Sequence, residues 1–424
     1  MVRSSKVFPI PQSTGIGSLN STLRSPARLL PVTARFLARA PKSQRSRPEV
    51  SVLVIQHLLA DTAHFVTLLR AAGFEVYRVI GVEYSSKPTV LQRLVKGGFD
   101  AVVPRFPDLP ATIRKALREF RGSSSGVARQ LVIHEVGGYC ADIVRLAPGL
   151  IPETCVGVVE ETKQGLWRYH KVRALGYPVL HIADSRLKNV EASYIGQAVA
   201  RSLLEDIESV RVRREGCTVG VLGSGVIGRS IHMSLSRLGL SVASWDKSPT
   251  ARMAMTERGF AVVKRAPLLK SSDAVIGATG ARSISWPDLR DMKDGVILAS
   301  ASSRTIELPV GDIRKYGARG VRQGYVEAYS MPWGKTVNLV HGGFPVNFRR
   351  RSLPFPVADL MFAQIAVCIG KLVKSEYAPS VHGLSKKDEV MIARAWVEQY
   401  GHQKHLARTT AEVRKVAANG GGWT

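Results

Sequence analysis

The sequence predicts an α/β protein with two domains, each a doubly wound parallel sheet, the second domain inserted in the first. Strands alternate with helices along most of the chain, which is typical of parallel sheets. One strand–helix unit carries a dinucleotide-binding glycine motif. At 424 residues and 45% hydrophobic content, the chain can bury two cores.

We expect four segments along the chain. Residues 1–48 form a basic flexible N-terminal arm, residues 49–200 and 345–400 a substrate domain, residues 201–344 a nucleotide domain, and residues 401–424 a tail. The arm contains nine Arg or Lys and no Asp or Glu. This composition suits a flexible arm with one docked turn at Leu30–Ala40, and also a transit peptide.

Regular elements begin after the arm. The apolar patterns predict alternating strands and helices in the first domain. The expected strands are Val52–Ile55, Glu75–Ile80, Ala101–Val103, Leu131–His134 and Val179–Ile182, and the expected helices are Asp61–Ala72, Pro88–Lys96, Thr162–Leu175 and Val190–Glu208.

The segment Cys217–Asp246 contains every part of a dinucleotide site. A buried strand, Val219–Leu222, leads into G-x-G-x-x-G, and an amphipathic helix and the strand Ser241–Trp245 follow. The cofactor pyrophosphate is expected on the loop and the first helical turn, which contain Gly223, Ser224, Gly225, Val226, Ile227 and Gly228. Asp246, at the end of the second strand, would accept hydrogen bonds from an adenosine ribose and repel a 2′-phosphate. The motif therefore predicts a Rossmann domain and favours NAD over NADP, although Lys247 and Arg252 could pair with a phosphate.

The rest of the second domain continues the alternating pattern. Strands are expected at Ala274–Ala278, Gly295–Ala299 and Val337–Val340. The apolar helix Ala358–Val373 is too long for a strand and is expected to return to the first domain.

Composition narrows the function classes. The net charge is +27, but the basic residues are spread along the chain without a recognition helix or aromatic motif, which argues against a nucleic-acid partner. No run of eighteen apolar residues occurs, so we expect no membrane span. The four cysteines form no C-x-x-C pair, which argues against a metal site and favours a reducing, cytoplasmic location.

Six motifs resemble the S-adenosylhomocysteine hydrolase family, and the likeness runs from about His57 to Val373. They are GVVEETKQG, the ADSRLKN segment, the glycine motif with its acid, DAVIGATG, MKDGVI and NLVHGGFPVNF. The resemblance implies an NAD-dependent enzyme that splits S-adenosylhomocysteine, or a related nucleoside, through oxidation of the ribose 3′-hydroxyl. A small nucleoside-type substrate is the implied partner.

The resemblance also implies residue roles. His57 matches an acid/base near the ribose 5′ end, and Glu161 matches a contact to the ribose hydroxyls. Lys188 matches a group beside the 3′-hydroxyl, which burial next to a nicotinamide cation would give a lowered pKa and the role of a base. Asp61 and Thr62 match positions that contact the substrate. Thr162, Thr279 and Asn347 match positions that line the cofactor.

Several family positions are replaced here. At positions where the family has acid/base groups, this chain has Val136, Ala192, Ser193 and Ser303. A further family histidine is replaced by the stretch Arg349–Pro354. Glu135 and Glu191 are candidates to replace the lost carboxylates, although Glu191 could equally be a solvated helix-face charge. Arg349, Arg350 and Arg351 could meet an anionic ligand in the cleft, or form a solvated loop. The family's C-terminal Lys and Tyr have no counterpart, so a homo-oligomer is left open.

Two alternatives remain. A degenerate member could bind NAD and regulate or scaffold a partner without turnover, because acid/base groups that act as a unit are lost together. A 2-hydroxyacid dehydrogenase shares the nucleotide fold, but its expected arginine and histidine have only a faint counterpart in Arg304.

Overall fold

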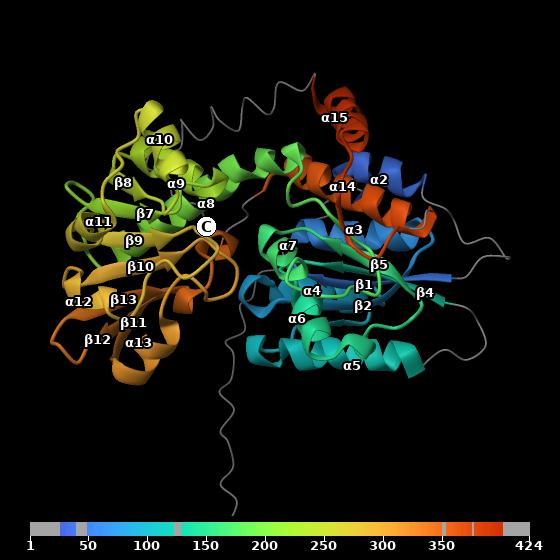
Figure 1. The fold of residues 1–424 in the computed structure, drawn as a ribbon, viewed down its shortest axis with the longest axis horizontal. Coiled ribbons are helices and arrows are strands. Elements are labelled where there is room, and N and C mark those ends of the chain that lie inside the picture. Colours follow the sequence, from blue (N-terminus) through green and yellow to red (C-terminus); the bar gives the residue numbers. More distant parts are fainter. Residues whose placement is uncertain (1–25, 40–48, 123–128, 350–352, 375–376, 402–424) are drawn as a thin grey trace, which may run out of the picture.

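The structure is a computed structural model that describes residues 26–39, 49–122, 129–349, 353–374 and 377–401. It has two lobes, each with a seven-stranded sheet covered by helices (Figure 1). The predicted fold class is confirmed, since parallel pairs dominate both sheets. The domain boundaries stay predictions.

The first sheet is entirely parallel, in the order β14-β6-β5-β4-β1-β2-β3. Its strands are β1 Glu49–Gln56, β2 Glu75–Gly81, β3 Ala101–Val102, β4 Arg129–Glu135, β5 Cys155–Glu160, β6 Val179–His181 and β14 Val381–Gly383. Its helices include α3 Ala60–Ala71, α4 Pro88–Lys96, α5 Leu109–Gly122, α6 Tyr139–Leu146 and α7 Lys163–Tyr169. The strand β14 comes from the end of the chain, so the chain returns to this sheet after the nucleotide lobe.

The helices α14 (Phe355–Lys374), α15 (Lys386–Tyr400), α1 (Pro26–Leu29) and α2 (Pro31–Leu37) complete this lobe. Asp359 of α14 is fully buried and accepts hydrogen bonds from the backbone N–H groups of Val32 and Thr33, the Thr33 hydroxyl and the Tyr400 hydroxyl. Leu30 and Leu37 are buried as well. The docked segment that we expected at Leu30–Ala40 is thus observed, and it begins earlier, at Pro26. Residues 1–25 and 40–48 of the arm lie outside the described part of the chain.

The second sheet has the order β11-β12-β13-β10-β9-β7-β8. Its strands are β7 Thr218–Leu222, β8 Ser241–Trp245, β9 Ala274–Gly277, β10 Val296–Ser300, β11 Ala318–Gln323, β12 Val326–Ser330 and β13 Thr336–Val340. Its helices are α9 Val226–Arg237, α10 Pro249–Glu257, α11 Arg265–Ser271, α12 Asp288–Asp291 and α13 Val310–Tyr316. The strand β12 pairs antiparallel with β13 and with β11, so the expectation of a wholly parallel second sheet is wrong at this edge.

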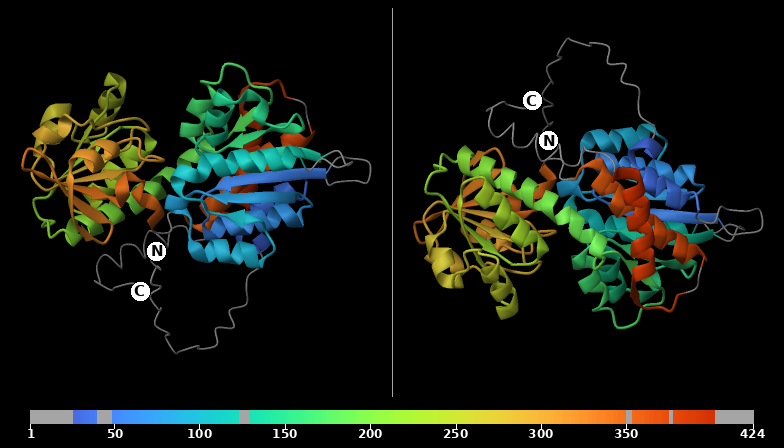
Figure 2. Two further views of the ribbon diagram at one scale, coloured as in Figure 1. Left: turned by 90° about the horizontal axis from the view of Figure 1, so that it is seen from below. Right: turned by 90° about the horizontal axis from the view of Figure 1, so that it is seen from above.

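A long helix, α8 (Asn189–Ser209), runs between the two lobes and packs along α9 (Figure 2). It begins at Asn189, and Lys188, directly before it, contacts Glu161, which follows the end of β5. The helix expected to reach Leu175 stops at Tyr169, since Val172 and Leu175 pack on the core from irregular backbone. The first turns of α7 and α8 both lie at the same edge of the first sheet.

Within the described residues, α14 is the one helix long and apolar enough to cross a membrane, but 78% of its most apolar window is buried inside the protein. Its apolar residues pack on the first sheet and on α2. The helix therefore has the burial of a core helix.

Candidate functional site

A cleft of about 550 Å³ lies between the two lobes. Its walls are the ends of β1 and β5, the first turns of α3, α7 and α8, the glycine loop, the loops after β9 and β10, and the start of α14. Parallel α/β sheets bind ligands at this place, outside the carboxyl ends of the strands. The structure thus brings residues from eight separate stretches of the sequence into one cavity.

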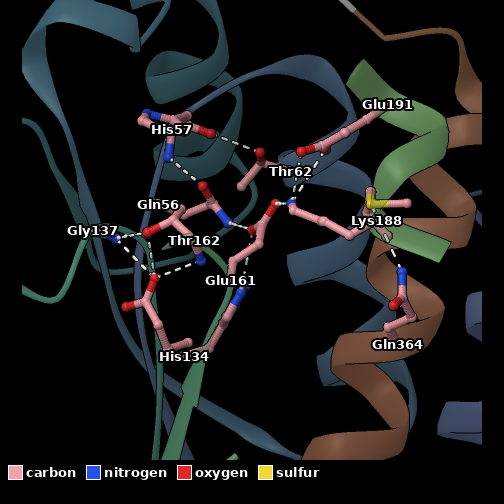
Figure 3. A network of polar contacts seen from close by, with 12 residues as sticks. Gln56, His57, Thr62, His134, Gly137, Glu161, Thr162, Lys188, Glu191 and Gln364 are labelled. Atoms are coloured by element: carbon pink, nitrogen blue, oxygen red, sulfur yellow. Dashed lines mark hydrogen bonds and ion pairs between the residues drawn. The ribbon is translucent and has the colours of Figure 1, made fainter. Parts of the chain in front are cut away.

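Lys188 is held between two carboxylates at the centre of the cleft. Its Nζ lies 3.0 Å from Glu161 Oε1 and 3.1 Å from Glu191 Oε1. Figure 3 shows the three side chains pointing toward one another, with Gln56 donating to Glu161 at 2.7 Å. The side chains of the lysine and the two glutamates are 14%, 17% and 13% exposed, respectively. Glu191 is therefore a cleft residue and not a solvated charge.

This network sets the protonation of its members. Burial would raise the pKa of Glu161, but Lys188, His134 and Gln56 together lower it to about 2. Burial would lower the pKa of Lys188, but the two carboxylates raise it above its ordinary value. Burial raises the pKa of Glu191, against the attraction of Lys188. We expected a nicotinamide cation beside the buried Lys188 to lower its pKa. In the structure the ammonium group contacts two carboxylates, which raise its pKa instead.

His57 lies on the opposite side of the network. Its Nδ1 is 2.5 Å from the Ser85 hydroxyl, and its ring packs against Phe348 with a centroid distance of 4.2 Å. Burial lowers the pKa of His57 to about 4, so the imidazole is neutral near pH 7. The predicted position of His57 in the cleft is thus observed.

The three residues expected to contact substrate divide into two groups. Asp61 and Thr62 line the cleft, and the Thr62 hydroxyl donates to the backbone carbonyl of His57 at 2.7 Å. Glu135, the last residue of β4, does not line the cleft, whereas Val136, which follows it, does. Its carboxylate accepts from the Tyr169 hydroxyl and the backbone N–H of Cys140. The expectation that Glu135 contacts substrate is therefore wrong.

Glu135 has a buried partner, Glu160. Burial raises the pKa of Glu135 to about 7 and that of Glu160 to about 8. Glu160 accepts from the backbone N–H groups of Gly137 and Gly138 and from Thr162. These two buried carboxyl groups stabilise the backbone between β4 and α6, next to the cleft residue Val136.

The glycine loop has the geometry that its sequence predicts. Gly223 has φ +106°, and a Cβ at Gly228 would lie 1.9 Å from the Gly223 carbonyl oxygen. A Cβ at Gly225 would meet no atom within 4 Å, so this position faces open space. Gly225, Val226 and Ile227 line the cleft, whereas Gly223, Ser224 and Gly228 shape the turn behind it.

Asp246 is anchored next to this loop. Its carboxylate accepts from the backbone N–H groups of Ser224 at 2.6 Å and Ser248 at 2.8 Å. Arg252 donates to the carbonyl oxygens of Asp246 and Lys247 at 2.6 and 3.2 Å. The Arg252 guanidinium is therefore bound to backbone carbonyls. The Asp246 carboxylate remains the charged group at the end of β8 that a ligand would meet.

The remaining cofactor candidates also lie in the cleft. Thr162, Thr279 and Asn347 line it, and the Thr162 hydroxyl caps α7. The buried Glu307 accepts from the backbone N–H groups of Thr279 and Gly280 at 2.7 Å each and so fixes the loop after β9. Glu307 and Gln56 were missed by sequence reasoning, since neither lies in a recognisable motif.

The replaced positions fall mostly in the cleft. Val136, Ala192 and Ser303 line it, while Ser193 is exposed and donates to the carbonyl of Val190. The expectation of an anion site is not met by Arg349, whose guanidinium is instead 2.5 Å from Asp206 of α8. Arg350 and Arg351 lie outside the described residues. No group of three His, Cys, Asp or Glu able to hold a metal ion occurs in the described ranges.

The fold and the cleft define a class: a two-lobed α/β protein with a dinucleotide-binding loop facing a cluster of acid/base groups. Residues 197–302 match the NAD binding domain of the D-isomer specific 2-hydroxyacid dehydrogenases. The expectation of NAD as cofactor is confirmed by this match and by the relatives below.

Curated relatives extend over most of the chain. It is 28% identical to S-inosyl-L-homocysteine hydrolase of Methanopyrus kandleri, covering 88% of each chain, and 27% identical to adenosylhomocysteinase of Thermoplasma acidophilum, covering 82% of this chain and 84% of that one. Among solved structures, a dipicolinate synthase from Bacillus halodurans is 14% identical, with TM-score 0.43 over 77% of this chain and 99% of that chain. The chain is thus similar to adenosylhomocysteinases and to an S-inosyl-L-homocysteine hydrolase over most of its length, and the names of these relatives support the expectation of an enzyme.

Proposed function

We propose that this protein is an NAD-dependent enzyme that acts on S-adenosylhomocysteine or a closely related nucleoside thioether by transient oxidation of the ribose 3′-hydroxyl. The observation that carries the proposal is the Lys188–Glu161–Glu191 network, which shares one cleft with Gly225 of the glycine loop. A nucleoside held in this cleft would have its ribose between the two.

The nucleotide lobe suits NAD. Open space beside Gly225, and the first turn of the twelve-residue helix α9, leave room for a pyrophosphate at a helix N-terminus. The Asp246 carboxylate at the end of β8 suits the adenosine ribose, and Asn347, which is 5% exposed, suits the nicotinamide amide. When bound, NAD+ supplies a hydride acceptor for the carbon that bears the hydroxyl.

The charges of the network suggest roles that differ from those expected from sequence. Glu161 stays ionised, so it can accept hydrogen bonds from ribose hydroxyls. Lys188 stays an ammonium group, so it can donate to the 3′ oxygen and stabilise negative charge developing there. Burial raises the pKa of Glu191, and Glu191 contacts Lys188. Glu191 can therefore hold or pass on the proton that leaves the 3′ oxygen.

The opposite wall supplies the other groups. Neutral His57 can take up or return a proton near the 5′ end of the sugar, and its carbonyl is held by Thr62. Asp61, an acceptor when ionised, suits a base with an exocyclic amino group, as in adenine. Val136 makes the neighbouring wall apolar, and we assign the movement of protons to His57 and Glu191.

The proposal is tested with the purified full-length protein and NAD+. S-adenosylhomocysteine, S-inosylhomocysteine and adenosine are added separately, and the absorbance of NADH is followed. We expect at least one nucleoside to reduce the cofactor, with the signal lost in Lys188→Met. Ser193→Ala, an exposed substitution on the same helix, should leave it unchanged. NAD+ binding without reduction by any of these compounds would refute the proposal.

A regulatory NAD-binding protein is the second candidate, and the replacement of cleft acids by Val136 and Ala192 favours it. It predicts tight NAD+ binding without nucleoside-dependent reduction. A 2-hydroxyacid dehydrogenase is supported less, because Arg304 does not line the cleft and instead contacts Asp142 at 3.0 Å and the Gly137 carbonyl.

A further inference from the structure

A second cavity, of about 450 Å³, lies where the lobes meet at the β11–β12 hairpin. It is lined by Arg314 of α13, Arg319 and Arg322 of β11, and Tyr325 next to β12, and by Glu83 and Tyr84 from the first lobe. None of these residues lines the NAD cleft. Its volume is in the range of small-molecule sites, which is about 300–1,000 Å³.

The charges of this cavity favour an anion. Glu327, on its wall, is paired with Arg319 and accepts from the Tyr329 hydroxyl at 2.6 Å. Glu83 accepts from the backbone N–H of Phe106 at 2.7 Å. Arg322 donates to the Gly324 carbonyl at 3.0 Å and lies opposite Glu327 in the β11–β12 pair, and Arg314 donates a hydrogen bond to Tyr329. Both guanidinium groups line this cavity, and neither is within ion-pair distance of a carboxylate among the described residues.

Gly342 leaves space for the Arg314 guanidinium at this cavity. Gly342 has φ +59°, and a Cβ there would lie 3.0 Å from Arg314 Nη2. A side chain would therefore be strained and would press on the guanidinium. Gly342, which does not line the NAD cleft, therefore fits a requirement for space at this cavity.

Aromatic rings complete the walls. Tyr84 stacks on Phe344 with a centroid distance of 4.8 Å, and Tyr325 is 44% exposed. Planar guanidinium groups suit phosphate oxygens, and exposed aromatic rings suit a nucleobase. We propose that this second cavity binds a diphosphate group, either free or carried by a nucleotide, independently of the NAD cleft.

The test uses isothermal titration calorimetry of the full chain saturated with NAD+, so that the glycine loop is occupied. The probes are inorganic pyrophosphate and uridine diphosphate. We expect binding to the wild type and a loss of about tenfold or more in Arg314→Ala/Arg322→Ala, since charge-assisted hydrogen bonds are lost. The control Arg118→Ala/Arg213→Ala removes two exposed charges elsewhere and should change affinity less than about twofold.

Gly342→Ala tests the geometry at constant net charge. It should weaken pyrophosphate binding while the protein still unfolds cooperatively on heating. Tyr325→Ala weakening only uridine diphosphate would support a nucleotide, and no effect on either probe would support the free anion. No binding to the wild type, or equal losses in both arginine double variants, would overturn the proposal, because the net charge of +27 alone would then explain any attraction.

Discussion

Replacing Lys188 by Met should uncover repulsion between two buried carboxylates. The pKa of Glu161 falls from 4.5 to about 2 in the folded protein. Each pKa unit corresponds to about 1.4 kcal/mol, so its surroundings contribute roughly 3 kcal/mol to folding at neutral pH. Because this pKa is lowered on folding, the contribution is present above about pH 4.5 and is lost as the pH falls toward 2. Lys188 is the largest stabilising partner.

The expected cost of Lys188→Met is therefore roughly 3–5 kcal/mol at pH 7, the range for breaking a buried ion pair. In the variant, Glu161 and Glu191 face each other without the ammonium group, so folding raises their pKa values. Stability should then increase as the pH falls from 7 toward 5, since protonation relieves the repulsion.

Glu191→Gln separates this account from simple loss of packing. In the wild type it should cost under about 1 kcal/mol, because Lys188 keeps Glu161 as its partner. In the Lys188→Met background it should restore about 1–3 kcal/mol, which reverses the sign. Urea unfolding of the four proteins measures both effects. Equal effects of Glu191→Gln in the two backgrounds, within about 0.5 kcal/mol, would refute the reasoning.

Two further predictions concern the glycine loop and the docked N-terminal segment. Gly228→Ala should destabilise the nucleotide lobe and abolish NAD+ binding, because its Cβ would lie 1.9 Å from the Gly223 carbonyl, whereas Gly225→Ala should fold normally and weaken only NAD+ binding. Calorimetric titration with NAD+ and thermal unfolding check this pair, and equal destabilisation by both would contradict it. Thr33→Val should cost roughly 1–3 kcal/mol in urea unfolding, since the buried Asp359 loses a donor at 2.6 Å. The exposed control Thr256→Val should stay within about 0.5 kcal/mol, and a Thr33 effect that small would show that the segment is not docked in solution.

The parts of the fold with a local signal could be predicted from sequence. The helix Pro88–Lys96 and the strand Ser241–Trp245 have the predicted bounds, because apolar periodicity and turn residues coincide there. The strand β11, Ala318–Gln323, is exposed at every residue and has no apolar alternation to reveal it. The three-residue strand β14 forms only by pairing with β6, some two hundred positions earlier, and local patterns do not encode such pairing.

The site shows the same division. The glycine loop and the positions of His57, Lys188 and Glu161 follow from motifs, and the structure brings all of them to the cleft. The charge of Lys188 could not be predicted, since it depends on Glu161, which arrives from the end of another strand. The position of Glu135 could be predicted, because the alternation Leu131, Ile133, Glu135 puts its side chain on the face of β4 whose apolar residues pack in a buried core.

That alternation also bears on how a cleft without an acid at position 136 could retain proton chemistry. Glu160 accepts hydrogen bonds from the backbone N–H groups of Gly137 and Gly138, and Glu135 accepts one from that of Cys140. Both glutamates are 0% exposed, so neither can reach a substrate. The first turn of α8 instead places Glu191 one residue before Ala192, in contact with Lys188. Under the proposed function, proton transfer is therefore assigned to Glu191 of α8 and to His57 rather than to the end of β4. Glu191→Gln should then lower nucleoside-dependent cofactor reduction while it leaves stability nearly unchanged.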